Sequence, residues 1–281
     1  MRVMFFSGSG LSAGSGIPTF RGRGGLYGGM RAEDVLSAET LLARPALVHG
    51  FMDDFRQMAA GKLPNAAHAM IAAWKRRAPE LTDVVTMNVD GLLEAAGCPE
   101  VVHLHGLLSQ VRSLGNAEIT AGIGGCRYWS GNPGGEPTAV IPWKGATCQV
   151  SGYQFRCPVS GSGFRPDVVM FGEAVGDPLA PWSYHPYYRA LRRLGPEDAL
   201  VVIGTRGNVV RVCHDARELR CLKILDNLEP ADPRWIDESA WDAVIHAPAA
   251  DAVPRIAAML DEWVGLNPGR KTVTAKERSG V

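Results

Sequence analysis

Short apolar runs that end in polar residues or glycine recur along the chain. A run that is apolar at consecutive positions, rather than at alternate ones, is typical of a strand buried on both faces of a parallel sheet. The pattern therefore predicts a mostly parallel sheet whose strands are residues 2–6, 83–86, 101–104, 168–171, 200–203 and 222–225.

A different periodicity covers residues 31–75, where apolar side chains recur at helical spacing. This stretch is expected to form a helical layer. Periodicity is lost in residues 114–163, where glycine, proline and aromatic residues are frequent, which indicates an inserted loop-rich module. From residue 265 onward we expect a frayed tail.

The chain has 281 residues, of which 46% are hydrophobic and 21% charged, and its formal net charge is zero. This composition is typical of a soluble globular protein, and without a basic excess neither nucleic acid nor an anionic membrane is expected as a partner. The N-terminus does not resemble a signal peptide, and no apolar stretch approaches the roughly 20 residues of a membrane span, so we expect a cytoplasmic protein. The six cysteines are scattered, and we expect them to be thiols.

The first predicted strand leads into a glycine-rich turn, Gly8-Ser-Gly-Leu-Ser-Ala13. It fits the dinucleotide fingerprint G-x-G-x-x-[GA], in which glycines let the backbone approach a pyrophosphate at a helix N-terminus. The acidic residue that usually follows about 20 positions later has no counterpart, because Glu33 and Asp34 lie in the helical stretch. The segment alone leaves open a glycine turn without a ligand.

Further motifs follow this turn in a fixed order: Thr86-Met-Asn-Val-Asp-Gly91, Val102-His-Leu-His-Gly106, Arg165-Pro-Asp-Val-Val-Met-Phe-Gly-Glu173, Gly204-Thr205 and Asn227-Leu-Glu-Pro230. Together with residues 8–21 they resemble the sirtuin (Sir2) family of NAD-dependent protein deacylases. The resemblance implies an α/β fold with a Rossmann-like parallel sheet, helices on both of its faces and a smaller helical and loop-rich domain. The large domain would comprise residues 1–24, 80–113 and 164–264, and the smaller one residues 25–79 and 114–163, followed by the tail 265–281.

The resemblance also implies which residues bind NAD. Arg21 would reach phosphate oxygens, and Phe20 would shield the reacting ribose carbon from water. Asn88 and Asp90 would hold the nicotinamide ribose and the carboxamide, although on the sequence alone Asp90 could simply cap the following helix. The expected NAD-binding residues are Gly8, Gly10, Ser12, Ala13, Ile17, Phe20, Arg21, Met87, Asn88, Val89, Asp90, Gly204, Thr205, Arg206 and Asn227.

His105 is the expected general base, and Asn88 is expected to take part in catalysis. An imidazole titrates near neutral pH, so it can take a proton from a ribose hydroxyl without being permanently charged. His103 lies on the same strand face, but the family pattern selects the histidine directly before Gly106. In the implied reaction the acyl oxygen of the substrate amide attacks the ribose and expels nicotinamide. His105 then activates a ribose hydroxyl, and the products are a free amine and O-acyl-ADP-ribose.

Residues 168–173 resemble the strand to which the substrate peptide adds. Val169 would accept a hydrogen bond from the acyl-lysine, and Phe171 would line an apolar tunnel, with Gly172 and Glu173 beside them. Met52 and Phe55 stand where desuccinylase members carry a tyrosine and an arginine that read an acidic acyl group. Because neither can pair with a carboxylate, we expect a neutral acyl group, carried by a protein lysine or by a small acylated amine.

Zinc is not expected. The family's module normally holds two Cys-x-x-Cys pairs, whereas here Cys126 and Cys157 each lack the second cysteine and Cys148 stands alone. A metal site made of these three cysteines and Glu136 is the alternative. We expect an aromatic core to replace the metal, formed by Tyr128, Trp129, Trp143, Tyr153 and Phe155.

Two further departures from the family leave the activity open. Met87 stands where the family usually carries glutamine, which removes a hydrogen bond to the nicotinamide ribose. Arg206 stands where it usually carries serine, and it is either a phosphate clamp or a solvated surface residue. We therefore expect an NAD-dependent deacylase, with an NAD glycohydrolase or ADP-ribosyltransferase as the alternative and a non-catalytic NAD-binding module as a third class.

Overall fold

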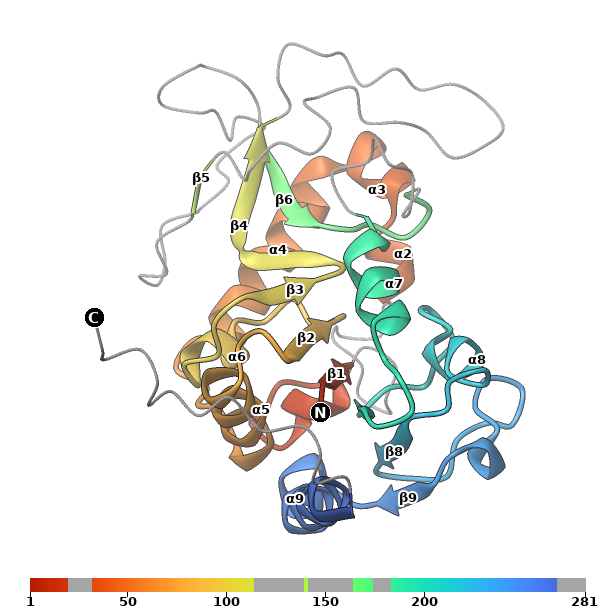
Figure 1. Cartoon of the computed structure of the whole chain (residues 1–281). Helices are drawn as coiled ribbons and strands as arrows, with labels where there is room; N and C mark the ends of the chain where they lie inside the picture. The colour runs from red at the N-terminus through yellow and green to blue at the C-terminus, as the bar shows by residue number, and fades with distance from the viewer. Residues whose placement is uncertain (20–31, 114–138, 141–163, 174–182, 267–281) are drawn as a thin grey trace.

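The computed structural model describes residues 1–19, 32–113, 139–140, 164–173 and 183–266. They form a large parallel sheet flanked by helices, with a smaller group of helices and strands to one side of it (Figure 1). The strands are β1 (Val3–Ser7), β2 (Thr82–Thr86), β3 (Val101–His103), β4 (Gly106–Ser113), β5 (Ala139–Val140), β6 (Phe164–Val168), β7 (Ala199–Ile203), β8 (Leu222–Asn227) and β9 (Ala243–His246). The helices are α1 (Gly10–Ala13), α2 (Ala32–Val35), α3 (Ala38–Ala43), α4 (Pro45–Ala59), α5 (Ala66–Arg77), α6 (Leu92–Ala95), α7 (His185–Arg192), α8 (Val212–Asp215), the 3₁₀ helix η1 (Glu238–Ala240) and α9 (Ala249–Leu266).

Six parallel strands make up the large sheet, in the order β3-β2-β1-β7-β8-β9. Successive side chains of β1 point to opposite faces, so that Phe5 joins the core cluster on one face and Phe6 the cluster on the other. Every residue of β1 and β7 is buried, as expected for strands covered on both faces. The strand order is that of a doubly wound dinucleotide-binding sheet, which confirms the predicted Rossmann-like fold.

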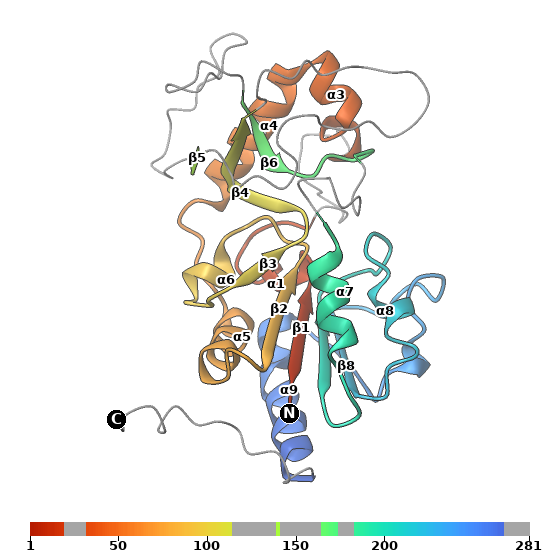
Figure 2. The ribbon, with the colours of Figure 1, turned by 45° about the horizontal axis from the view of Figure 1, so that its top comes forward.

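Helices cover both faces of this sheet. On one face α5 and α9 pack against it through Ile71 and Ile256, among others. On the other face α7 and α8 do so through Tyr187 and Val212. Figure 2 shows α7 and α8 together on the side away from α5 and α9.

The smaller group consists of α2, α3, α4 and a three-stranded antiparallel sheet in the order β5-β4-β6. Its core includes Phe51 of α4, Leu108 of β4 and Val168 of β6. Val89 and Leu92, which follow β2, belong to the same cluster. The segment after β2 therefore links the large sheet to this smaller core.

Some sequence predictions about the elements are wrong. Residues 168–171 are not a strand of the parallel sheet, because β6 ends at Val168 and pairs antiparallel with β4 in the small sheet. Strands β4 and β9 were not predicted. Helix α9 continues through Leu266, so the first two residues assigned to the tail are helical. In the described part of the chain, no helix combines the length and the apolar character needed to cross a membrane.

Helix α5 packs on the large sheet, although residues 25–79 were assigned to the smaller domain. Its side chains Ala67, Ile71 and Ala72 are buried in the same cluster as β1, β2 and α9. A capping box fixes its first turn, with Asn65 accepting hydrogen bonds from the backbone N–H groups of Ala67 and His68. Periodicity identified the helix but could not tell which layer it covers.

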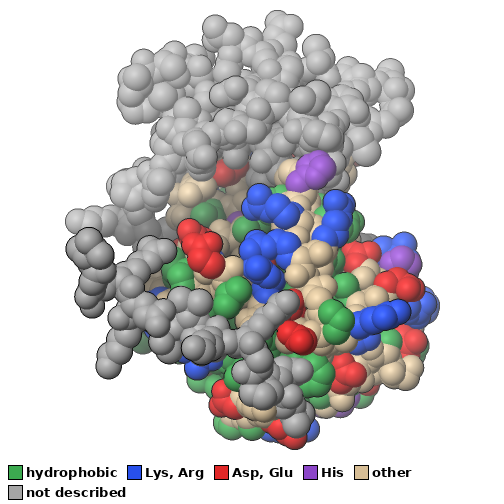
Figure 3. Space-filling view, in the orientation of Figure 1, with side chains coloured by type: hydrophobic (Ala, Val, Ile, Leu, Met, Phe, Trp, Pro, Cys, Tyr) green, Lys and Arg blue, Asp and Glu red, His purple; other side chains and the backbone are tan. Residues whose placement is uncertain are grey.

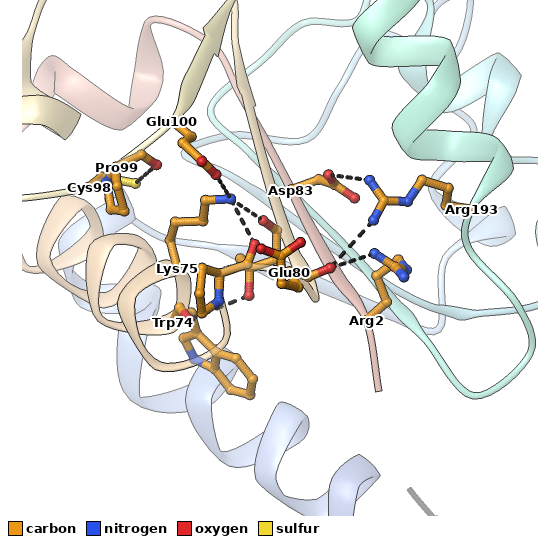
Figure 4. A network of polar contacts seen from close by, with 11 residues as sticks. Arg2, Trp74, Lys75, Glu80, Asp83, Cys98, Pro99, Glu100 and Arg193 are labelled. Carbon is orange, nitrogen blue, oxygen red and sulfur yellow. Dashed lines mark hydrogen bonds and ion pairs between the residues drawn. The ribbon is translucent and has the colours of Figure 1, made fainter. Parts of the chain in front are cut away.

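A polar network ties the helices to the amino ends of β2 and β3 (Figure 4). The buried ammonium of Lys75 donates to backbone carbonyls at positions 79 and 82 and lies 2.8 Å from the carboxylate of Glu100. Arg193 pairs with Asp83 at 3.2 Å and, like Arg2, donates to the carbonyl of residue 80. Lys75, Asp83, Glu100 and Arg193 border a cavity of about 310 Å³. Figure 3 shows basic and acidic side chains gathered on this face of the molecule.

Candidate active site

The residues expected to bind NAD follow neighbouring strands at their carboxyl ends. Ser12 lies just after β1, Asn88 and Asp90 after β2, and His105 after β3. Because β1 pairs with β2 and β2 with β3, all in parallel, these ends meet at one edge of the sheet. Topology alone thus gathers the predicted site, at the end of the sheet opposite to the Lys75 network.

The hydroxyl of Ser12 is the centre of a buried hydrogen-bond network. Its oxygen lies 2.9 Å from Oδ2 of Asp90, 3.1 Å from Nδ2 of Asn88 and 3.2 Å from Nε2 of His68. All four side chains are buried. The network joins the turn after β1, the segment after β2 and helix α5, and it thereby fixes the relative positions of three parts of the site.

The direction of each hydrogen bond in this network follows from His68. The backbone N–H of Asn65 donates to Nδ1 of His68 at 3.2 Å, and burial lowers the pKa of His68 to about 4, so that the ring is neutral at pH 7. A neutral ring that accepts at Nδ1 carries its proton on Nε2, which therefore donates to Ser12. Ser12 in turn donates to Asp90. Because Nδ2 of Asn88 also donates to Ser12, the amide oxygen of Asn88 is the atom left to bind a ligand.

Asp90 both stabilises a helix start and belongs to the network. Its Oδ1 accepts from the backbone N–H of Leu92 at 3.1 Å, at the start of α6, while Oδ2 accepts from Ser12. Burial raises the pKa of Asp90, and the hydrogen bonds from Leu92 and Ser12 oppose this rise. The helix-capping alternative and a role in the site are therefore compatible.

His105 lies in the short turn between β3 and β4 and is half-buried. Burial lowers the pKa of His105 to about 4, and a hydrogen bond between the ring and the backbone of Met87 acts in the opposite direction. The ring is therefore neutral at physiological pH. A neutral imidazole with one nitrogen free to accept is the form required of a general base.

His103 is not suited to that role. Its Nδ1 lies 2.8 Å from the backbone oxygen of Asn88, and its Nε2 lies 2.7 Å from the carboxylate of Glu94. Both ring nitrogens thus have protein partners, and the ring anchors the segment that carries Asn88. This geometry supports the choice of His105 over His103.

The glycines of the first turn are required by contacts within the protein. A Cβ on Gly10 would lie 2.6 Å from the Cα of Gly204, and one on Gly8 would lie 2.8 Å from the Gly204 oxygen. The N–H groups of Gly8, Gly10 and Leu11 donate to the backbone carbonyls of Ile203, Gly204 and Gly8. The close approach of two loops therefore accounts for these glycines without a phosphate, and phosphate binding at this one-turn helix stays a prediction.

The other expected NAD-binding residues are placed as follows. Thr205 is buried, and its hydroxyl accepts from the backbone N–H of Gly207, whereas Arg206 is exposed. Asn227 is buried at the carboxyl end of β8. Ile17 and Val89 are buried in the smaller core, Met87 packs beside the cluster under α7, and Ala13 is exposed.

The segment after β6 lies directly against His105. The backbone N–H of Val169 donates to the carbonyl of His105 at 3.0 Å. Phe171 exchanges backbone hydrogen bonds with the segment before α3, donating to Leu36 and accepting from Ala38. Within the described part of the chain, no group donates to the Val169 carbonyl.

Glu173 has a structural role that the sequence analysis missed, since it was expected to bind substrate. Its carboxylate is paired with two nitrogens of the buried Arg165 guanidinium and accepts from the backbone N–H of Met170 at 2.8 Å. Its side chain is 6% exposed. These bonds use both carboxylate oxygens, so Glu173 shapes the loop around Gly172, whose φ of +84° suits glycine.

Met52 and Phe55 belong to the hydrophobic core. Met52 is fully buried and Phe55 is 3% exposed, and both pack in the cluster of α4, β4 and β6. Both side chains are core residues in this structure, and their contact with the acyl group stays a prediction. The helical pattern of residues 31–75 fits a core role equally well.

Several expected residues lie outside the described part of the chain. They are Phe20 and Arg21, the three cysteines Cys126, Cys148 and Cys157, Glu136 and the five aromatic residues expected to replace the metal. Among the described residues there is no group of three or more His, Cys, Asp or Glu side chains placed to hold a metal ion. Whether zinc is bound therefore stays a prediction.

Comparisons with known proteins found a matching family, similar sequences and similar structures. A model of the Sir2 family matches residues 8–211. The NAD-dependent protein deacylase of Salmonella typhimurium is 32% identical over 258 residues, covering 90% of this chain and 81% of that protein. The one from Ralstonia nicotianae is 33% identical over 266 residues, covering 92% and 91%. A solved complex of a Sir2 homologue with NAD is 25% identical with a TM-score of 0.66, covering 93% of this chain and 90% of the other.

Proposed function

The chain belongs to the Sir2 family, and on this premise we propose that it removes an acyl group from lysine side chains of proteins with NAD as co-substrate. Nicotinamide and O-acyl-ADP-ribose would be the other products. The observation that carries the proposal is the grouping of Asn88, Asp90 and a neutral His105 at one edge of the sheet.

The hydrogen-bond acceptors at this edge fit NAD. The free amide oxygen of Asn88 can accept from a ribose hydroxyl, and the buried carboxylate of Asp90 can accept from the NH₂ of a carboxamide. When bound, NAD supplies a glycosidic bond with nicotinamide as the leaving group and a ribose that takes the acyl group.

The protein's own side chains position NAD and remove a proton from its ribose. Asn88 and Asp90 are held by Ser12 before any ligand arrives, so little ordering is required on binding. His105, neutral at pH 7, takes the proton of a ribose hydroxyl. His68 keeps Ser12 in the acceptor orientation that Asn88 needs.

A protein substrate fits the segment after β6. An extended peptide can add to it as a strand through the Val169 carbonyl, which has no donor among the described residues, next to His105. The substrate amide N–H would donate to that carbonyl and place its acyl group beside the base.

The environment of the segment after β6 suits a neutral acyl group. Two guanidinium groups in the smaller group of helices and strands are engaged internally: Arg165 binds Glu173, and Arg56 binds Asp53 and the carbonyl of Leu108. Neither guanidinium is presented to an acidic acyl chain. Faster removal of succinyl than of acetyl from one peptide sequence would contradict this preference.

Release of nicotinamide, measured with and without an acetyl-lysine peptide, tests the activity. Deacylation requires that release depends on the peptide and that each nicotinamide is matched by one deacylated lysine. Release that does not depend on the peptide indicates a glycohydrolase or transferase instead, and no release indicates a binding module.

A further inference from the structure

The hydroxyl of Tyr184 lies beside the catalytic nitrogen of His105. Tyr184 is the residue before α7, and its oxygen is 3.5 Å from Nε2 of His105. The two ring centroids are 6.5 Å apart at an interplanar angle of 49°. Tyr184 also packs against the sheet in the cluster that contains Met87 and Val102, so the position of its ring is set by the fold.

The direction of this contact follows from the state of each group. Burial raises the pKa of the Tyr184 phenol to about 12, so the hydroxyl keeps its proton at neutral pH. The neutral ring of His105 has one N–H, and the bond to the Met87 backbone favours the charged ring, so the ring is the donor in that bond. Nε2 is then the acceptor, and Tyr184 donates to it.

Other titratable groups near His105 are engaged elsewhere. From the turn, His103 is bound to Glu94 and to the backbone of Asn88. From the segment after β2, Asp90 is bound to Ser12 and to the start of α6. In the described part of the chain, Tyr184 and the Met87 backbone are the groups hydrogen-bonded to the His105 ring.

We propose that Tyr184 is a positioning residue for the general base: its hydroxyl holds Nε2 of His105 in the acceptor state. This rests on the proposed function of His105. A contact of 3.5 Å is long for an O–H···N bond, so the tyrosine hydroxyl is readily displaced from Nε2. The nitrogen has a single lone pair, so a ribose hydroxyl that reaches it takes the place of the tyrosine hydroxyl, and Tyr184 holds the acceptor state in the free protein.

The test compares Tyr184→Phe with wild type by NMR titration of the imidazole of His105 in the free protein, assigned with His105→Gln. Phenylalanine keeps the ring and its burial, and removes only the donor. Donation to Nε2 favours the neutral ring, so its loss raises the pKa of His105, by about half to one unit for a typical hydrogen bond. Tyr188→Phe, a neighbouring and more exposed tyrosine of α7, is the matched control and should leave the titration unchanged.

Steady-state kinetics provide the second measurement. In Tyr184→Phe the acid limb of kcat/KM for NAD should move to higher pH by the same amount, because this limb reports the titration of the free enzyme. An unchanged titration and an unchanged acid limb would overturn the proposal, since a residue that only packs moves neither. The titration needs no turnover, so an inactive wild type would contradict the proposed function and leave this result readable.

A fluorinated tyrosine at position 184 covers the case in which Tyr184→Phe does not fold. Fluorine beside the hydroxyl makes it a stronger donor while the ring keeps its shape. The pKa of His105 should then fall below that of wild type, and a pKa that stays the same or rises would overturn the proposal.

Discussion

Glu173 and Arg165 form a buried ion pair in which the carboxylate meets two guanidinium nitrogens. Arg165 also donates to the carbonyls of Pro166 and Val168, and Glu173 accepts from the N–H of Met170. The pair therefore bridges the two ends of the segment that carries Val169. It fixes the backbone on which the substrate peptide is proposed to bind.

Glu173→Ala should destabilise the protein by about 3–5 kcal/mol, because it leaves a buried guanidinium without its partner. In any folded fraction, the KM for an acyl peptide should rise more than the KM for NAD. Chemical denaturation and initial rates measure the two effects. Asp232→Ala, which removes an exposed pair with Arg234, is the control and should leave the denaturation midpoint unchanged. A Glu173→Ala protein as stable as wild type would show that the pair does not hold this segment.

Gly10→Ala should destabilise the protein by about 1–3 kcal/mol or more and weaken NAD binding. The added Cβ would lie 2.6 Å from the backbone of Gly204, which cannot move as a flexible side chain can. Gly50→Ala is the matched control, because nothing lies within 4 Å of a Cβ at this helical position. It should instead stabilise the protein by roughly 0.5–1 kcal/mol. Equal effects of the two substitutions in denaturation would contradict the close contact of the loops.

Asp226→Asn should stabilise the protein at pH 8. Asp226 is 1% exposed, and its Oδ1 has no hydrogen-bond partner among the residues that the structure describes. Burial raises the pKa of its carboxyl to about 7, against a smaller opposing effect of His246 and Arg255. The folded state thus binds this proton more tightly than the unfolded state. The stabilisation that the protonated Asp226 gives to the folded state is therefore lost as pH rises from about 4 through 7.

Denaturation of wild type and Asp226→Asn across this pH range checks the prediction. The difference in free energy of unfolding should be small near pH 4 and should favour the variant increasingly up to pH 8. The exposed Asp261→Asn in α9 is the control. A difference that does not change with pH would mean that Asp226 does not titrate in this range.

His68→Gln should reduce the loss of stability in acid. The pKa of His68 is lowered to about 4 by burial, so the unfolded chain binds this proton first and stability falls as pH drops from about 6.5 towards 4. His49 and His105 have pKa values lowered to about 4 as well, so the slope should decrease without disappearing. Denaturation at several pH values measures the slope. His214→Gln, at an exposed position, is the control and should not change the slope of stability against pH. An unaltered slope in His68→Gln would contradict the claim that His68 is buried as a neutral ring.

The sequence predicted the large sheet well because its strands are apolar on both faces and end at polar residues. Strands 2–6, 83–86, 101–104, 200–203 and 222–225 all fall in the parallel sheet within one or two residues. The run at 168–171 has the same apolar character but lies in the small core, because a local pattern does not encode which sheet a segment joins. The same reason explains why α5 was assigned to the wrong layer.

In the site, motifs found the residues but not their partners. Asn88, Asp90 and His105 were expected, and the structure brings them to one edge of the sheet. His68 was given no role from the sequence, because its contact with Ser12 depends on the packing of α5, 56 positions away in sequence. Tyr184 is 79 positions from His105. Nothing in the local sequence indicated this contact.

The structure of the chain bound to NAD is the most direct test of the central claim. A hydroxyl of the nicotinamide ribose should lie within about 2.6–3.2 Å of Nε2 of His105, and the amide oxygen of Asn88 should bind the same ribose. A ribose held elsewhere, with His105 still bound only to Met87 and Tyr184, would contradict the assignment of His105 as the base.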